Sequence, residues 1–378
     1  MSSLSVGGRL HLFEIATLPE TLMSSDSAPE LVVTNLNRNF TGVSATIDQL
    51  LRIQEKNYKT LFCGNPLPAV NTKPVSIRQA ILSSFRAPRN RPCIIWHVRR
   101  NCEMFWALVA RDLLRLPIKT VFTSAAIRRH SALPRFLISR MDAVVATSPR
   151  AAGFVPNVVA VVPHGVDTSS FQPAVDRASA WQATGFSGKR GIATVGRVRP
   201  EKGTDLFVEA MIRILPHHPE VTALIIGKTE AKFARFSQAL KRRIAEAGLE
   251  GRICFTGEIE KQKLPEILSA LTLLVAVPRY EGYGMTPLEA MASGTPVVVS
   301  DTGAFATFVA NSKSGRLVPI NDIEKVCDAV EEILDDPNLA EDMSRGARET
   351  VEQEFSVTQE IEGIGQVYQQ LWELRNAA

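Results

Sequence analysis

The sequence lacks the features of a secreted or membrane-embedded protein. Its N-terminal segment, MSSLSVGGRLHLFEIATLPE, has no basic start followed by a long apolar run, so we expect no signal peptide. Nowhere does the chain contain about 18 uninterrupted apolar residues, the length that a membrane-spanning helix needs. The five cysteines are odd in number, scattered and without metal-ligand spacing. These absences predict a cytoplasmic chain with free thiols.

Several catalytic signatures are absent too. The sequence has no Ser-His-Asp pattern, no His-Glu-x-x-His motif, no Asp-x-Asp pair placed to clamp a metal in a loop, and no Walker spacing of glycine and lysine. Aromatic residues do not alternate with basic ones as they do in RNA-binding segments. We therefore expect no metal, no cofactor and no nucleic-acid partner.

Charge is unevenly distributed along the 378 residues, a length that allows two domains of ordinary size. Residues 1–170 contain 20 Lys and Arg against 10 Asp and Glu, whereas residues 171–378 contain 23 against 29. A basic half joined to an acidic half predicts that one half faces an anionic partner. A phosphorylated lipid surface and a charged acceptor both fit, and a scattered solvated face is the plainer alternative.

Strand and helix patterns alternate in two runs, as in parallel sheets whose faces are covered by helices. We expect an α/β fold with domains over residues 1–170 and 171–356, a linker over 167–189, and a last helix within 357–378 that packs back on the first domain. Open parallel sheets bind ligands beyond the carboxyl ends of their strands, which places the site in the cleft between the domains. The expected strands span 31–33, 93–96, 119–122, 143–146, 158–162, 191–195, 223–226, 252–255, 271–277 and 296–299, and the expected helices span 41–51, 103–114, 205–215, 233–247, 287–292, 323–334 and 357–375.

The most unusual segment is Arg279–Gly294, with the sequence RYEGYGMTPLEAMASG. Its glycine-rich turn leads into a helix for which Thr286 is the predicted N-cap, with Pro287 at the first helical position and Glu289 at the third, a capping box. The free N–H groups of a helix start bind anions. Because Glu281 in the turn would repel an anion, we expect it to contact a hydroxyl-bearing part of the same ligand. In the plainer alternative, Glu289 only caps the helix.

A second segment, GRVRPEKG at 196–203, also follows a predicted strand and precedes a helix. Arg197 and Lys202 project from this loop at the expected cleft. A guanidinium binds two phosphate oxygens at once and a lysine adds a compact charge, so the loop suits a diphosphate. The alternative is a surface loop whose lysine pairs with Glu201 in solvent.

Loops of the first domain supply weaker candidates. Gly42, before the first helix, is a position where the backbone could approach a ligand closely, or an ordinary turn. His97, His130 and His164 each come near a strand end, and each is equally open to a structural role, as is Asp167 in a turn after His164. Nearby arginines would make this region cationic and fit to receive an anionic acceptor: Arg99, Arg100, Arg128 and Arg129.

Three motifs together resemble the family 4 glycosyltransferases: GRVRPEKG at 196–203, EGYGMTPLEAMASGTPVV at 281–298 and VPHGVD at 162–167. Their spacing fits as well, so the resemblance extends over nearly the whole chain. Glu281 and Glu289 match the Glu-x7-Glu signature of that family. The resemblance implies the GT-B fold of two Rossmann-like domains, and transfer of a sugar from a nucleotide-sugar to an acceptor with retention of anomeric configuration, usually without a metal.

The resemblance also implies a role for each site residue. Arg197 and Lys202 would hold the donor diphosphate, and Glu289 would bind the ribose hydroxyls. Glu281 would hold the donor sugar. His130 falls where the family often has a histidine near that sugar, although here it lies several residues after the strand. Further donor contacts would come from Gly42, Gly282, Tyr283, Gly284, Met285 and Thr286.

More narrowly, the segments RNFTGVSATI, WHVRRNCEM and FTSAAIRRH are similar to bacterial lipopolysaccharide core mannosyltransferases. This implies GDP-mannose as donor, a Kdo-containing lipid A core as acceptor, and peripheral contact with the cytoplasmic face of the inner membrane. Arg279 departs from the family pattern by replacing a small residue just before the Glu-x7-Glu signature. Open alternatives are another donor such as UDP-glucose, a sugar-nucleotide epimerase or a phosphorylase on the same architecture, and a non-catalytic binding subunit.

Overall fold

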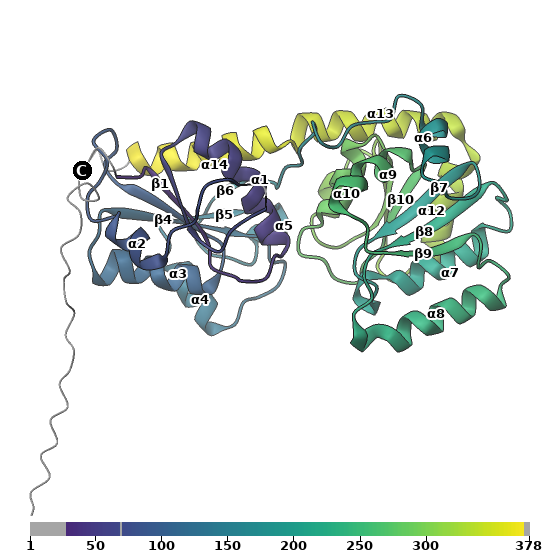
Figure 1. The fold of residues 1–378 in the computed structure, drawn as a ribbon, viewed down its shortest axis with the longest axis horizontal. Coiled ribbons are helices and arrows are strands. Elements are labelled where there is room, and N and C mark those ends of the chain that lie inside the picture. The colour runs from purple at the N-terminus through teal and green to yellow at the C-terminus, as the bar shows by residue number, and fades with distance from the viewer. Residues whose placement is uncertain (1–27, 69, 374–378) are drawn as a thin grey trace, which may run out of the picture.

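The computed structural model describes residues 28–68 and 70–373. Within them, the chain forms two parallel β-sheets of six strands, each covered by helices (Figure 1). The predicted α/β architecture of two Rossmann-like domains is therefore confirmed. The segment for which no signal peptide was predicted lies outside the described residues.

The first sheet has the strand order β2-β1-β3-β4-β5-β6. Two helices bury their apolar residues against one face: α1 (Gly42–Asn57) and α14 (Val357–Glu373). Two others bury theirs against the opposite face: α3 (Asn101–Leu108) and α4 (Ala132–Ser139). Its strands are β1 (Leu31–Asn35), β2 (Thr60–Gly64), β3 (Ile94–Val98), β4 (Ile118–Ser124), β5 (Ala143–Ala146) and β6 (Val158–Val161). Its helices are α1 (Gly42–Asn57), α2 (Ile77–Leu82), α3 (Asn101–Leu108) with a π-helical turn (Val109–Leu113), α4 (Ala132–Ser139) and α5 (Pro149–Ala152).

The second sheet has the order β12-β11-β10-β7-β8-β9. Its strands are β7 (Arg190–Val195), β8 (Val221–Ile226), β9 (Ile253–Gly257), β10 (Leu273–Ala276), β11 (Val297–Ser300) and β12 (Gly315–Val318). Its helices are α6 (Arg177–Ala183), α7 (Thr204–Ile214), α8 (Ala234–Glu246), α9 (Leu264–Ala270), α10 (Met285–Ala292), α11 (Phe305–Phe308), α12 (Ile323–Asp335) and α13 (Pro337–Glu354), and 3-10 turns lie at Pro200–Lys202, Ala231–Phe233 and Lys261–Lys263.

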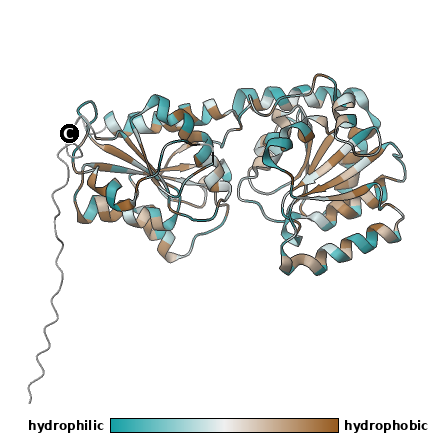
Figure 2. Ribbon diagram, in the orientation of Figure 1, coloured by the Kyte–Doolittle hydropathy of each residue, from teal (hydrophilic) through white to brown (hydrophobic). Residues whose placement is uncertain are grey.

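Strand cores are hydrophobic in both sheets, as Figure 2 shows by their brown colour. All the predicted strands are present with shifts of a few residues, but β2 and β12 were not predicted. Both are edge strands with half-buried residues, so their apolar signal is weak. Among the described residues, no helix is long and apolar enough to cross a membrane.

The chain passes between the two domains twice, side by side. It crosses first at Val166 and returns at Ser356, and the two crossings are hydrogen-bonded: the Val166 N–H donates to the Phe355 carbonyl at 2.8 Å and the Val357 N–H to the Val166 carbonyl at 3.1 Å. Helix α14 (Val357–Glu373) then lies across the first domain, seen in yellow in Figure 1. Its Tyr368 and other apolar residues complete a core cluster of that domain.

The segment predicted as a linker, 167–189, is only partly one. Helix α6 forms within it and packs on the second domain, where Trp181 is buried. A Cβ on Gly191 would lie 2.0 Å from the Trp181 ring, so strand β7 needs a glycine where the indole packs. Its sequence shows little periodicity because one large apolar side chain, that of Trp181, holds it against the second domain.

Candidate active site

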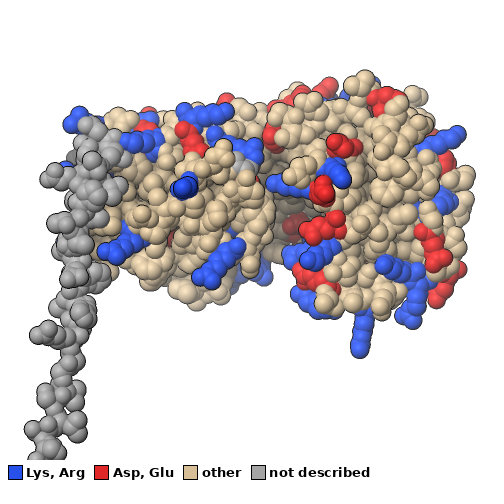
Figure 3. Space-filling view, in the orientation of Figure 1, with Lys and Arg blue, Asp and Glu red and all other residues tan. Residues whose placement is uncertain are grey.

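The carboxyl ends of both sheets face a cleft between the domains, and a cavity of about 390 Å³ lies there. Figure 3 shows the surface hollowed at this place. The first domain contributes the start of α1, and the second contributes the loops after β7 and β10. The lining residues include Thr41, Gly42, Val43, Thr46, Ala125, His164, Thr194, Val195, Lys202, Glu281, Gly282, Tyr283, Gly284, Met285, Thr286 and Phe305.

Helix α10 begins two residues earlier than the capping box would require, so that prediction is wrong. The N-cap is Gly284, with φ 96°, and no side chain caps the helix. Thr286 is the second helical residue. The left-handed turn is held by Phe305, whose ring would lie 2.0 Å from a Cβ on Gly284. The first N–H groups of α10 therefore lack side-chain acceptors and can bind an anion.

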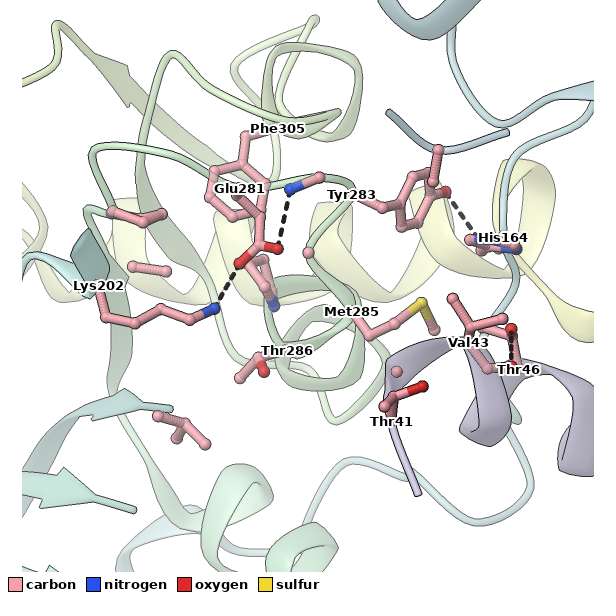
Figure 4. Close-up of a pocket in the computed structure, with 18 of the residues that line it drawn as sticks. Thr41, Val43, Thr46, His164, Lys202, Glu281, Tyr283, Met285, Thr286 and Phe305 are labelled. Atoms are coloured by element: carbon pink, nitrogen blue, oxygen red, sulfur yellow. Dashed lines mark hydrogen bonds and ion pairs between the residues drawn. The ribbon is translucent and has the colours of Figure 1, made fainter. Parts of the chain in front are cut away.

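Lys202 and Glu281 meet in the cleft (Figure 4). The Lys202 Nζ lies 2.5 Å from the Glu281 Oε2, and the Gly282 N–H donates to the Glu281 Oε1 at 3.0 Å. Gly203, which ends the Lys202 turn, has φ 70°, and a Cβ there would lie 2.0 Å from the Val277 carbonyl oxygen. Two tight backbone turns thus bring one cation and one carboxylate together beside the helix start.

Arg279 connects the loop after β10 to the loop that carries Lys202. Its departure from the family pattern did not predict this role. Its guanidinium binds Asp205 in a bidentate ion pair, with both N–O distances 2.8 Å, and also donates to the Pro200 carbonyl. Its backbone N–H donates to the Glu201 carbonyl at 2.9 Å. Fork-to-fork pairs of this kind fix geometry as well as charge, so Arg279 positions the turn that carries Lys202.

Arg197 and Glu289 do not line the cavity in this structure. The Arg197 side chain is 56% exposed, and its guanidinium pairs with the Glu230 carboxylate at 2.9 Å. Glu289 lies half-buried on α10, where burial raises the pKa of its carboxyl to about 7. Lys261 lowers this pKa but does not outweigh burial. The predicted diphosphate contact of Arg197 and the ribose contact of Glu289 stay predictions.

The histidines differ sharply in their surroundings. His164 lines the cavity, and its Nδ1 lies 2.7 Å from the Glu360 Oε1. His97 does not face the cleft: it is fully buried between the Tyr368 hydroxyl at 2.5 Å and the Thr123 hydroxyl at 2.7 Å, and burial holds its pKa well below its usual value.

His130 lies in the loop after β4, outside the cavity lining. Its Nε2 is buried and has no hydrogen-bond partner among the described residues. Burial, with a contribution from Arg128, lowers its pKa. A neutral imidazole is therefore favoured, and its predicted place beside the donor sugar stays a prediction. Asp167 accepts hydrogen bonds from Ser169 and Ser170, which is the structural alternative for that residue.

Gly42 faces the cavity as the first residue of α1, and a Cβ there would meet no atom within 4 Å. Two helix starts, those of α1 and α10, therefore face the same cavity from opposite domains. Arg100 braces α1 through the Thr41 and Ser44 hydroxyls at 3.3 and 3.0 Å. Arg99 is buried, so of the four predicted cationic residues only two are exposed: Arg128 and Arg129.

The chain is similar in sequence to known proteins. Residues 177–350 match the family model described as glycosyl transferases group 1. The chain is 41% identical over 349 residues to the lipopolysaccharide core biosynthesis mannosyltransferase LpsB of Rhizobium meliloti, covering 90% of this chain and 97% of that protein. It is 41% identical over 343 residues to the mannosyltransferase LpcC of Rhizobium leguminosarum bv. viciae, covering 90% and 96%.

The fold has matches among solved structures. Anabaena HepE in complex with UDP has a TM-score of 0.78 at 16% identity, covering 90% of this chain and all of that one. The sucrose-phosphate synthase of Thermosynechococcus elongatus has a TM-score of 0.72 at 18% identity, covering 91% and 99%. At these identities the likeness concerns the fold alone, and it identifies the arrangement as GT-B.

Proposed function

This chain belongs to the group 1 glycosyltransferases, and we propose that it transfers mannose from GDP-mannose, with retention of configuration, to a lipopolysaccharide core acceptor of the Kdo-lipid A type. The observation that carries the proposal is the Lys202–Glu281 pair beside the uncapped start of α10. The names of the two mannosyltransferase relatives support the sugar and the acceptor class.

The charges in the cleft suit departure of a nucleoside diphosphate. Lys202 and the first N–H groups of α10 would bind the diphosphate and stabilise the negative charge that develops as the glycosidic bond breaks. The Lys202 ammonium has three donors, so it can bind phosphate while keeping Glu281 in place. Arg197 would add a second cation by exchanging Glu230 for phosphate.

The two glutamates would then bind hydroxyl groups. Glu281, oriented by Lys202 and the Gly282 N–H, would accept hydrogen bonds from the donor sugar. Glu289 would accept them from the ribose, and His130 would lie near the donor sugar. We place this reaction at the cytoplasmic face of the inner membrane, where the anionic glycolipid acceptor would be presented to the basic first domain.

The experiment that tests the proposal compares donors and follows the product. The enzyme is incubated with Kdo-lipid A core and either GDP-mannose or UDP-glucose, and the anomeric configuration of the product is read by NMR. We expect α-mannosyl transfer from GDP-mannose. Transfer only from another nucleotide-sugar would show that GDP-mannose is not the donor. Conversion of a nucleotide-sugar without acceptor would identify an epimerase.

A further inference from the structure

We propose that the outer face of α3, its π-helical turn and α4 docks on an anionic phospholipid bilayer. This inference rests on the proposed function for its purpose, the presentation of a lipid-linked acceptor, but the surface stands on its own observations. The apolar-basic face, as we call it, consists of Phe105, Trp106, Leu113, Leu114, Leu133 and Phe136 with the arginines Arg115, Arg128, Arg129 and Arg135.

Helices α3 and α4 are apolar on two sides. Their inner sides bury residues such as Met104 and Leu137 against the first sheet. On the outer side, Leu113 is 73% exposed, Leu133 64% and Phe136 61%. A helix that is hydrophobic all round is normally buried between two layers, and here the structure supplies only the inner one.

The outer side carries aromatic and aliphatic side chains together, as an interfacial membrane surface does. Phe105 and Trp106 form an edge-to-face pair with ring centroids 5.6 Å apart, and aromatic residues of this kind favour the boundary between headgroups and acyl chains. Figure 2 shows hydrophobic residues on both helices, which lie side by side on the face of the first sheet away from α14.

The positive charge of the apolar-basic face favours anionic lipids. Residues 101–140 contain seven Lys and Arg but only two Asp and Glu, and one of those two, Glu103, is buried. Arg115, Arg128, Arg129 and Arg135 are exposed. In Figure 3 the lower part of the first domain accordingly carries more Lys and Arg than Asp and Glu. Basic residues near an anionic surface strengthen binding at low salt, so a phosphatidylglycerol surface is favoured over a zwitterionic one.

The position of this face relative to the cleft fits the acceptor. The loop from Ala125 to Ser131 connects the end of β4 to the start of α4, and Ala125 lines the cavity. A bilayer that contacts Leu133 therefore lies at the mouth of the cleft, from which a lipid-linked sugar reaches the donor without leaving the membrane.

The protein contains a built-in reporter for the test. Of its four tryptophans, Trp96, Trp181 and Trp372 are at most 2% exposed, whereas Trp106 is 37% exposed and lies in the apolar-basic face. We expect vesicles of phosphatidylglycerol and phosphatidylcholine to shift the fluorescence of the full-length protein to the blue and to sediment it, whereas pure phosphatidylcholine vesicles do neither. Quenching by brominated acyl chains would report insertion of Trp106, and binding should weaken with salt.

The variant Leu133→Ser/Phe136→Ser should lose about tenfold or more in vesicle affinity. Arg115→Glu/Arg135→Glu should lose the preference for phosphatidylglycerol. Both changes are at exposed positions, so the melting temperature should not move. The matched controls are Leu317→Ser/Ile320→Ser, which removes two exposed apolar residues of the second domain, and Arg242→Glu on α8.

Three results would overturn the inference: no preference of the protein for anionic vesicles, equal vesicle binding by the Leu133→Ser/Phe136→Ser variant, or a dimer that this variant dissociates while vesicles are ignored. The assay contains no donor and no acceptor, so its outcome does not depend on the proposed reaction. Conversely, transfer to a water-soluble, delipidated acceptor should be the same for the variant and the unaltered protein.

Discussion

At the scale of single residues, the cleft is organised by side chains that hold one another. Lys202 is oriented by Glu281, and the turn that carries Lys202 is oriented by Arg279. A donor that enters this cleft therefore meets a cation already in position, and little free energy is spent on ordering it.

Replacing Lys202 by Ala should lower kcat/KM for transfer about 100- to 1000-fold, because the charge on the departing diphosphate loses its main cation. Steady-state kinetics with GDP-mannose measure the loss. Lys325→Ala, at an exposed position of α12, is the matched control and should change nothing. Turnover of Lys202→Ala within about threefold of the unaltered enzyme would show that the diphosphate binds elsewhere.

Glu289 should make stability depend on pH. Burial raises its pKa in the folded state to about 7 from an ordinary value of 4.5. The folded protein then binds more protons than the unfolded chain above pH 4.5, so the free energy of unfolding falls as pH rises from there through 7. Glu289→Gln removes the ionisation and should gain stability on the order of 1–2 kcal/mol at pH 8.

The measurement for Glu289 is the difference in melting temperature between Glu289→Gln and the unaltered protein at pH 5 and pH 8. The difference should be more positive at pH 8. Glu324→Gln, whose side chain is 72% exposed, serves as control and should show no such trend. A difference that is the same at both pH values would mean that Glu289 titrates normally.

At the scale of elements, the loop 196–203 and the loop after β10 behave as one unit. Arg279 joins them, because it binds the Pro200 carbonyl in the loop and Asp205 at the start of α7. Arg279→Ala and Asp205→Ala should each lower kcat/KM about tenfold, and the double variant should cost little more than either alone. A double-mutant cycle on kcat/KM measures this coupling. Strictly additive losses would show that the pair does not position Lys202.

The sequence predicted which elements meet at the cleft but not how they are joined. Buried strands such as β8 were predictable because their apolar runs are continuous. The start of α10 was misplaced because Thr286 and Glu289 have capping-box spacing, while the contact that decides the turn, Gly284 against Phe305, joins positions 21 residues apart. The side-chain partners of Arg279 and His97 lie still farther away in sequence, between 26 and 271 residues from them, so no local pattern could reveal them.

At the scale of the whole molecule, helix α14 connects the cleft to the core of the first domain. Glu360 accepts hydrogen bonds from the His164 Nδ1 and from the Gly165 N–H at 2.8 Å, and the His164 carbonyl accepts one from the Tyr283 hydroxyl at 2.8 Å. One buried carboxylate on the last helix thus holds the crossing segment that lines the cavity.

Glu360→Ala should therefore lower stability by about 2–3 kcal/mol, because two buried donors lose their acceptor. It should lower kcat as well, since His164 would no longer be fixed. Thermal denaturation and kinetics measure the two effects. Glu362→Ala, two residues along and exposed, should leave both unchanged. A stable Glu360→Ala variant with full activity would show that α14 does not position the residues of the site.

The return of the last helix to the first domain also bears on the order in which the chain can fold during synthesis. Domains usually fold from the N-terminus as they emerge from the ribosome. Here the core of the first domain includes Ile361, Tyr368 and Trp372, which are made only after all the strands of the second domain. Its sheet must therefore wait, with the part of one apolar face that α14 covers still open, until α14 has been made. The second domain, although encoded later, contains all its strands before the first can close.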